Sequence, residues 1–467
     1  AAALGLMEPV LPPRLADGLT MAVSPAGALF ALGVTAATAL LASLAPALRT
    51  SRTSALAMKG HAPQTLGGHG AARIRNGLAA VQIAFSMVLL VLAGLFAQSL
   101  ANVARIDLGI DVDSLVSFDV SPRSNGYGPE RTLAVYDQIE QALSAQPGVE
   151  RVSSAAIPLL AGRGFGVTVS VDGFEDGARP VEASMNLVGT GFLETVSIGL
   201  REGRGFTNAD LAGPPRVALV NERFVRAYGL QDGAIGRRIL FGDDTPLEIV
   251  GVIADTAYSE VKSDVPPQII APRSLDTSSP LSLLSFLASS ATFYVRTAID
   301  PDALVAAIPR VVAGVDPTLP VSNVITLRRQ AQENIFVDRL VTILSASFAS
   351  LATLLAAIGL YGVLAYGIAQ RTRELGLRLA LGAEPRNLRA MVVRQVAGVT
   401  IVGIALGAVA AIALGRAAQA LLYGLSGYEP VVIVAAATVL ATVVFAAAYV
   451  PARRASSIAP MEALRYE

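Results

Sequence analysis

The chain has 467 residues, of which 53% are hydrophobic and only 15% are charged, and its mean hydropathy is +0.56. Since a soluble domain carries about 25% charged residues, this composition indicates a membrane protein. The formal net charge of zero argues against nucleic acid as a partner, and the lack of cysteine excludes disulfides and thiolate chemistry. The two histidines lie in a glycine-rich stretch, which favours a linker over a metal site.

Five apolar segments are long enough to cross a bilayer, which takes about 20 helical residues. They occupy 23–48, 77–103, 339–370, 395–420 and 430–450. Basic residues gather in three of the segments that separate or follow them, at 49–76, 371–394 and 451–467. Because cytoplasmic loops carry the excess of Lys and Arg, these three segments are predicted to be cytoplasmic, which places the stub 1–22 outside.

Residues 104–338 form one large extracytoplasmic insert with mixed charge and many glycines and prolines. Each of its ends predicts a strand–helix–strand unit, and Asp300 and Pro301 are typical of a helix start. The predicted elements are strands at 114–121, 148–157, 291–297 and 319–326 and helices at 128–146 and 300–315. The centre is strand-rich, which predicts a split βαβ base at 112–164 and 266–330 with an inserted β-rich module at 165–265. The expected fold is therefore a polytopic α-helical membrane protein, with about five transmembrane helices and a large α+β extracytoplasmic domain.

Two span ends are alike. Pro25 and Pro46 are 21 positions apart, as are Pro430 and Pro451, and basic tails follow both pairs. This likeness favours an internal duplication, in which the span at 23–48 ends a first permease copy and the rest of the chain forms a second. The chain is then expected to be the C-terminal part of a longer protein.

Catalytic motifs are missing from the sequence. Neither Lys59 nor Lys262 stands in a G-x-x-x-x-G-K-[ST] loop, and G-x-S-x-G and H-E-x-x-H are also absent. We therefore predict no catalytic residue and no metal ligand. The spans hold almost nothing ionisable, which argues against an ion-coupled transporter. Glycines in the third and fourth spans are expected to allow close helix packing, namely Gly359, Gly362, Gly367, Gly403 and Gly407.

The segment "RTRELGLRLALGA" at 371–383 predicts a short amphipathic helix on the cytoplasmic side. Glu374 and Arg378 form an i,i+4 pair of favourable polarity, Gly382 can end the helix, and Pro385 can begin the next one. Such a helix either lies on lipid headgroups or docks in a groove of a partner protein.

The stretches at 75–100, 361–383 and 451–467 resemble the MacB/FtsX-type ABC transporter permeases. The specific part of this resemblance is the pattern R-x-x-E-L-G-L-R-x-A-L-G-A, which begins at Arg371. The apparent duplication resembles the MacB-like permeases with two fused copies that occur in acidobacteria.

The resemblance implies a transport or mechanotransmission subunit of the bacterial inner membrane, not an enzyme. It would couple ATP hydrolysis by a separate cytoplasmic ABC ATPase to conformational change in a periplasmic MacB-like domain, for efflux or export. ATP and Mg²⁺ would bind only to that partner. The resemblance further implies a homodimer, or an intrachain pseudo-dimer with the first copy, and a periplasmic adaptor or effector.

The resemblance also favours docking of the charged segment on the ATPase. The residues expected to couple to it are Arg373, Glu374, Leu375, Gly376, Arg378, Leu379, Leu381, Gly382, Ala383, Arg386 and Arg389. Two alternatives stay open. One is a membrane-anchored sensor or regulator, including FtsX-like activation of cell-wall hydrolases, and the other is a membrane enzyme with its site in the insert. The sequence predicts no substrate.

Overall fold

A computed structural model describes residues 25–37, 39–40, 67–162, 164–172, 181–211, 216–241, 245–262, 264–273, 289–370 and 384–455. The chain divides into two compact units. A helical unit comprises 1–91, 348–411 and 433–467, and an outer unit comprises 92–347 and 412–432.

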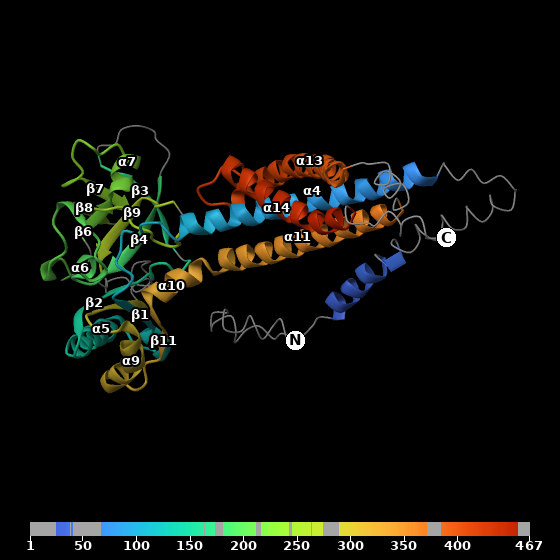
Figure 1. Cartoon of the computed structure of the whole chain (residues 1–467). Helices are drawn as coiled ribbons and strands as arrows, with labels where there is room; N and C mark the ends of the chain where they lie inside the picture. The colour runs from blue at the N-terminus through green and yellow to red at the C-terminus, as the bar shows by residue number, and fades with distance from the viewer. Residues whose placement is uncertain are drawn as a thin grey trace. The chain divides into compact units, whose positions relative to one another are not determined.

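Four long apolar helices have the length and composition to cross a membrane. They run side by side in Figure 1 and are α4 (Gly67–Val103), α11 (Phe336–Gln370), α13 (Pro385–Ala417) and α14 (Pro430–Ala455). Two of them begin at a proline, whose fixed φ suits the first helical position. The apolar stretches of these helices correspond to four of the five predicted spans. The remaining one, at 23–48, is helical over Pro25–Ala37, and its other residues lie almost entirely outside the described part of the chain.

The base of the outer unit is a four-stranded antiparallel sheet with two helices. Its strands are β1 (Leu115–Val120), β2 (Val149–Ala155), β10 (Ala291–Thr297) and β11 (Val321–Thr326), and its helices are α5 (Pro129–Ser144) and α9 (Pro301–Val315). Alternate residues of β1 and β10 pack against α5 and α9, which explains the apolar pattern of these strands. The opposite face, which includes Leu115 and Tyr294, contributes to a second apolar cluster.

The inserted module continues the same sheet, in the order β11-β1-β10-β2-β4-β3-β7-β8-β6-β9, with β5 paired to β8. Its strands are β3 (Gly166–Val171), β4 (Val181–Val188), β5 (Leu200–Gly203), β6 (Val217–Asn221), β7 (Arg238–Phe241), β8 (Thr245–Ile253) and β9 (Gln268–Pro272). Its apolar core is formed by β3, β4 and β6 to β9 with α7 (Glu222–Ala227).

Two features of the module differ from the sequence-based prediction. The base was expected to resume at 266, yet β9 pairs with β4 in parallel and with β6, so this strand belongs to the module. The stretch 216–229, taken as part of the strand-rich centre, divides into β6 and α7. Asn221 caps that helix by accepting the backbone N–H of Phe224 at 2.9 Å.

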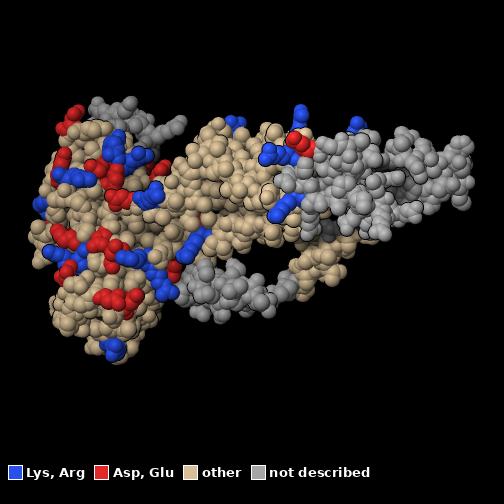
Figure 2. Space-filling view, viewed as in Figure 1, with Lys and Arg blue, Asp and Glu red and all other residues tan. Residues whose placement is uncertain are grey.

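Charged side chains gather on the outer unit, whereas the visible faces of the long helices are largely uncharged (Figure 2). This contrast is expected, because a charged side chain in the bilayer core is costly and one on a water-exposed domain is not.

Candidate functional site

The predicted ATPase-coupling residues are described only in part. The nine from Arg373 to Ala383 lie outside the described residues. Arg386 and Arg389 belong to the first turns of α13, which begins at Pro385 as predicted, and the Arg386 side chain is exposed. The positive end of the helix dipole disfavours a cation there, so Arg386 does not help α13 to form.

In the helical unit, α4 is the most enclosed of the four long helices. Half of its most apolar window is buried, against 17–28% for the others. Glycines allow two helices to approach it closely. A Cβ at Gly403 or Gly407 of α13 would lie 2.6–2.7 Å from α4 atoms, and one at Gly359 of α11 would lie 2.5 Å from the Gln82 side chain. The other two predicted packing glycines, Gly362 and Gly367, have no such neighbour within 4 Å among the described residues.

Polar contacts also join α4 to α11 within this unit. The Ser86 hydroxyl is fully buried and donates to the Ala352 carbonyl at 2.9 Å. The Arg75 guanidinium lies 4.9 Å from the centroid of the Tyr366 ring, within cation–π range. These contacts fix the two helices to each other at two separate levels.

A feature that we call the stalk junction lies in the outer unit and comprises 103–114, 156–162, 254–262 and α10 (Leu327–Asn334). Here the Gln330 amide donates to the Leu159 carbonyl at 2.6 Å, and the Leu159 N–H donates to the Tyr294 hydroxyl at 2.7 Å. Burial raises the pKa of Tyr294, which therefore stays neutral. The chain passes from α4 into this junction and leaves it through α10 and α11, so the junction connects two membrane helices to the base.

An ion pair strengthens the stalk junction at the start of α11. The Lys262 ammonium contacts the carboxylate of Asp338, which lies in the first turn of α11, and both side chains are about three-quarters buried. The negative charge of Asp338 is also favourable at a helix N-terminus. Lys262 had been noted in the sequence only as a lysine outside any P-loop.

A buried polar cluster joins the base to the module. Arg273, which follows β9, is only 3% exposed and contacts Ser154 of β2 and Glu140 of α5, the latter at 3.4 Å. Its guanidinium lies 4.6 Å from the centroid of the Tyr136 ring. Burial raises the pKa of Glu140, although Arg273 and Ser154 act in the opposite direction. No local sequence pattern predicted this cluster, because Glu140 and Arg273 are 133 positions apart.

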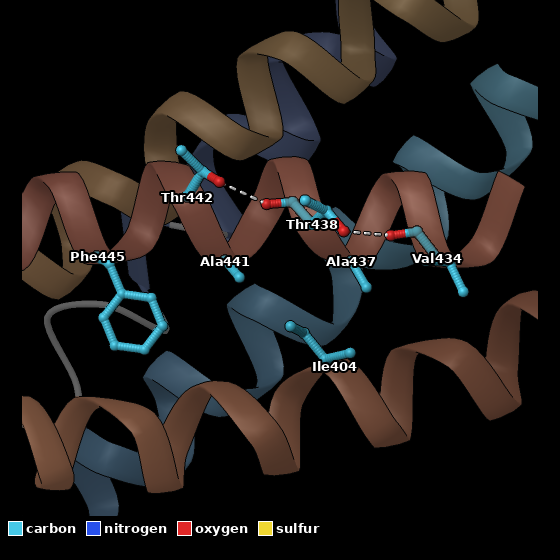
Figure 3. A pocket seen from close by; sticks show the side chains of 7 residues that line it. All are labelled: Ile404, Val434, Ala437, Thr438, Ala441, Thr442 and Phe445. Carbon is cyan, nitrogen blue, oxygen red and sulfur yellow. Dashed lines mark hydrogen bonds between the residues drawn. The ribbon is translucent and has the colours of Figure 1, made fainter. Parts of the chain in front are cut away.

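An apolar groove of about 640 Å³ lies between α13 and α14 in the helical unit (Figure 3). Its lining comprises Ile404, Val434, Ala437, Thr438, Ala441, Thr442 and Phe445. The hydroxyls of Thr438 and Thr442 donate to carbonyls of their own helix at 2.8 Å each. Their donors are thus occupied, and the groove presents an apolar surface that suits hydrocarbon chains.

Two family models match the chain. Residues 77–336, more than half of it, match the MacB-like periplasmic core domain, and residues 346–460 match the FtsX-like permease C-terminal domain. The border between the two matches falls near the start of α11, where the outer unit gives way to the helical one.

Curated relatives share the same combination. "Macrolide export ATP-binding/permease protein MacB 1/2" of Paracoccus denitrificans is 25% identical over 69% of this chain and 46% of its own length. "Uncharacterized ABC transporter permease YknZ" of Bacillus subtilis is 23% identical over 61% and 70%. "Pyoverdine export ATP-binding/permease protein PvdT" of Pseudomonas putida is 26% identical over 57% and 40%. The chain thus spans less than half the length of the MacB and PvdT relatives that it matches.

Among solved structures, the periplasmic region of MacB from Actinobacillus actinomycetemcomitans covers 50% of this chain and 97% of its own, with 13% identity and a TM-score of 0.34. The matched domains, together with the four membrane-length helices and the α+β outer domain, describe a multi-pass membrane protein with a periplasmic domain. The chain belongs to the MacB/FtsX-type family of ABC transporter permeases.

Proposed function

We propose that this chain is the permease of an exporter in the inner membrane, and that it transmits the ATP cycle of a separate cytoplasmic ATPase to its periplasmic domain. The observation that carries the proposal is the continuity of α11. This helix has 35 residues and is therefore about 52 Å long, whereas the bilayer core is about 30 Å thick. It begins beside the stalk junction and ends at Gln370, directly before the charged segment at 371–394.

The absence of a Walker A motif from these 467 residues supports a role without its own ATP hydrolysis. ATP and Mg²⁺ would bind to the partner ATPase. The printed names of relatives include both fused ATP-binding/permease proteins and a permease, YknZ. A second permease, either another copy of this chain or a preceding copy in the same polypeptide, would complete the pair that two ATPase subunits act on.

Export is the direction of transport that we favour, because the matched relatives are named for macrolide export and pyoverdine export. The described spans hold almost no ionisable side chains along which an ion could be relayed. Energy would therefore come from ATP, and the moving parts would be the membrane helices and the base and module of the outer unit. A periplasmic adaptor or effector would receive that movement.

The coupling surface would be the segment from Arg373 to Arg389. An amphipathic helix with Leu375 and Leu379 on one face suits a groove of the ATPase. The exposed Arg386, placed against the dipole of α13, suits an acidic surface on that same partner.

The test is co-purification of the full chain with a cytoplasmic ABC ATPase from the same organism, followed by Gly376→Asp and Leu379→Asp. We expect both substitutions to abolish co-purification and stimulation of ATP hydrolysis, because a carboxylate in an apolar groove is desolvated without a partner. Leu200→Asp is the matched control, since Leu200 is an exposed leucine of the outer unit and its replacement should change neither readout. If Leu379→Asp assembles and couples as the parent does, the docking surface is elsewhere. If the parent protein binds no ATPase at all, the proposed function itself is wrong.

A further inference from the structure

The segment that joins α13 to α14, residues 418–429, is held against the outer end of α4. We call this segment the outer loop. The Tyr423 N–H donates to the Ser99 hydroxyl at 2.9 Å, and the Asn102 amide donates to the Tyr423 carbonyl at 3.5 Å. Ser99 is only 4% exposed, so its hydrogen bond is shielded from water. Ser99 and Asn102 lie on one face of α4, three positions apart.

Glycines bring the outer loop this close. Gly427 has a φ of +70°, and a Cβ there would lie 2.5 Å from the Gly415 carbonyl oxygen. Gly424 has a φ of +65°, and a Cβ there would lie 3.4 Å from the Asn102 amide nitrogen. A Cβ on Gly94 of α4 would lie 2.6 Å from the side chain of Val432, which is near the start of α14. Left-handed backbone and backbone–backbone contact of this kind both favour glycine, so a larger residue at Gly424 or Gly427 would disturb the contact with α4.

The same loop also reaches the stalk junction. Tyr423 packs against the apolar cluster to which Val103 at the end of α4, Leu115 of β1 and Leu327 of α10 contribute. The outer loop therefore forms hydrogen bonds between its backbone and side chains of α4, and its Tyr423 ring joins the apolar cluster of the stalk junction.

We propose that this outer-loop contact, made by Ser99, Asn102 and Tyr423, is a second route by which movement of the membrane helices reaches the periplasmic domain. The proposal rests on the proposed function. The charged segment joins α11 to α13. Movement of α11 passes to the base through the chain itself, at α10. The chain provides no such direct covalent path from α13 to the base, and the hydrogen bonds between the outer loop and α4 supply a non-covalent one. Ser99 and Asn102 are positioning residues, which keep α13, α14 and α4 moving together.

The experiment uses pairs of spin labels, for which the chain is well suited because it has no native cysteine. Gln419 in the outer loop and Glu150 on β2 are both exposed and belong to the same compact unit. The Gln419→Cys/Glu150→Cys protein is labelled in lipid nanodiscs, and the distance distribution is measured without nucleotide, and then with the ATPase and a non-hydrolysable ATP analogue.

We expect one narrow distance distribution in the parent protein. In Ser99→Ala/Asn102→Ala a second population should rise about tenfold, the effect of about 1.4 kcal/mol lost when a buried N–H is left without its acceptor. Ser86→Ala is the matched control, because Ser86 is a buried serine on the same helix whose hydroxyl contacts α11 instead. Ser99→Thr keeps the hydroxyl and should behave as the parent. If Ser99→Ala does not accumulate, Asn102→Ala alone is measured, with a smaller expected increase.

An unchanged distribution in these alanine variants would overturn the inference. The inference would also be overturned if, in these alanine variants, the nucleotide changed the distance between the two labels by as much as it does in the parent. If the parent protein fails to bind any ATPase, the proposed function fails, yet the distributions without nucleotide still decide whether the outer-loop contact holds α4.

Discussion

Replacing Arg273 by methionine should loosen the junction between base and module. Methionine keeps an unbranched side chain of similar reach but removes the contacts with Glu140 and Ser154 and the stacking on Tyr136. Glu140 then keeps only the Ser154 hydroxyl as a partner among the described residues. The carboxylate becomes a buried charge without its counter-ion.

The size of the effect follows from the geometry of the pair. Breaking a buried ion pair by removing one partner costs about 3–5 kcal/mol. The Arg273–Glu140 distance of 3.4 Å is long, and the Glu140 side chain is 20% exposed. We therefore expect a cost at or just below the lower limit of that range, about 2–3 kcal/mol of local stability at neutral pH.

The cost should depend on pH in a definite direction. Burial already raises the pKa of Glu140 above its ordinary value of 4.5, and the loss of Arg273 raises it further. A raised carboxyl pKa gives stability that is present below 4.5 and is lost as the pH rises through the folded-state pKa. The difference between Arg273→Met and the parent should therefore shrink on acidification, because a neutral Glu140 has no charge to leave unpaired.

Hydrogen exchange of the full chain in nanodiscs, read by mass spectrometry on peptides from α5, β2 and β9, measures this local stability. The control is Arg273→Met/Glu140→Met, which removes both charges and should recover most of the loss. An equal cost at acidic and neutral pH, or a double variant as unstable as the single one, would refute the reasoning.

Three further predictions concern packing, hydrogen bonding and acid stability. Gly407→Leu should destabilise the helical unit by about 1–3 kcal/mol through overpacking against α4, which a lower thermal midpoint in detergent would show. Gly398→Leu should change that midpoint little, because a Cβ at Gly398 has no neighbour within 4 Å in the described part of the chain. Tyr294→Phe leaves the buried Leu159 N–H without its acceptor and should cost about 1–3 kcal/mol, measured by hydrogen exchange. Tyr136→Phe removes a hydroxyl that has no partner among the described residues, so the same measurement should show a neutral or stabilising effect. Hydrogen bonds from Arg204 and Thr207 lower the pKa of Asp210 from 3.8 to about 2, so its contribution to stability is present above pH 3.8 and is lost as the pH falls towards 2. Asp210→Asn should therefore flatten the acid-unfolding curve between these two pH values, as followed by circular dichroism. An unchanged curve would contradict this prediction.

Local signals in the sequence are enough to predict the base. Asp300 and Pro301 begin α9 in the structure, and the Asp300 side chain accepts the Asp302 N–H at 3.1 Å. The strands predicted at 114–121 and 291–297 both lie within two residues of β1 and β10. Such signals are local because a helix start and a strand face are set by neighbouring residues.

Pairing between distant strands left no such signal. Nothing near Gln268 indicates that β9 leaves the base to pair in parallel with β4, because its partners are about 80 positions away. The outer-loop contact is hidden for the same reason. Ser99 lies 324 positions before Tyr423, and nothing in the sequence near Ser99 indicates that its hydroxyl accepts the Tyr423 N–H.

The sheet of the outer unit is thinnest between β2 and β4, whose ladder holds a single residue pair, Ala155 with Val188. The register of β1, β2, β10 and β11 is therefore fixed entirely within the base. Since a strand register is set by its paired neighbours, changes of length within the module leave the register of the base unchanged, provided that Arg273 stays in place to pair with Glu140. A permease built in this way can acquire a new periplasmic surface by changes within one insert, while its membrane helices stay the same.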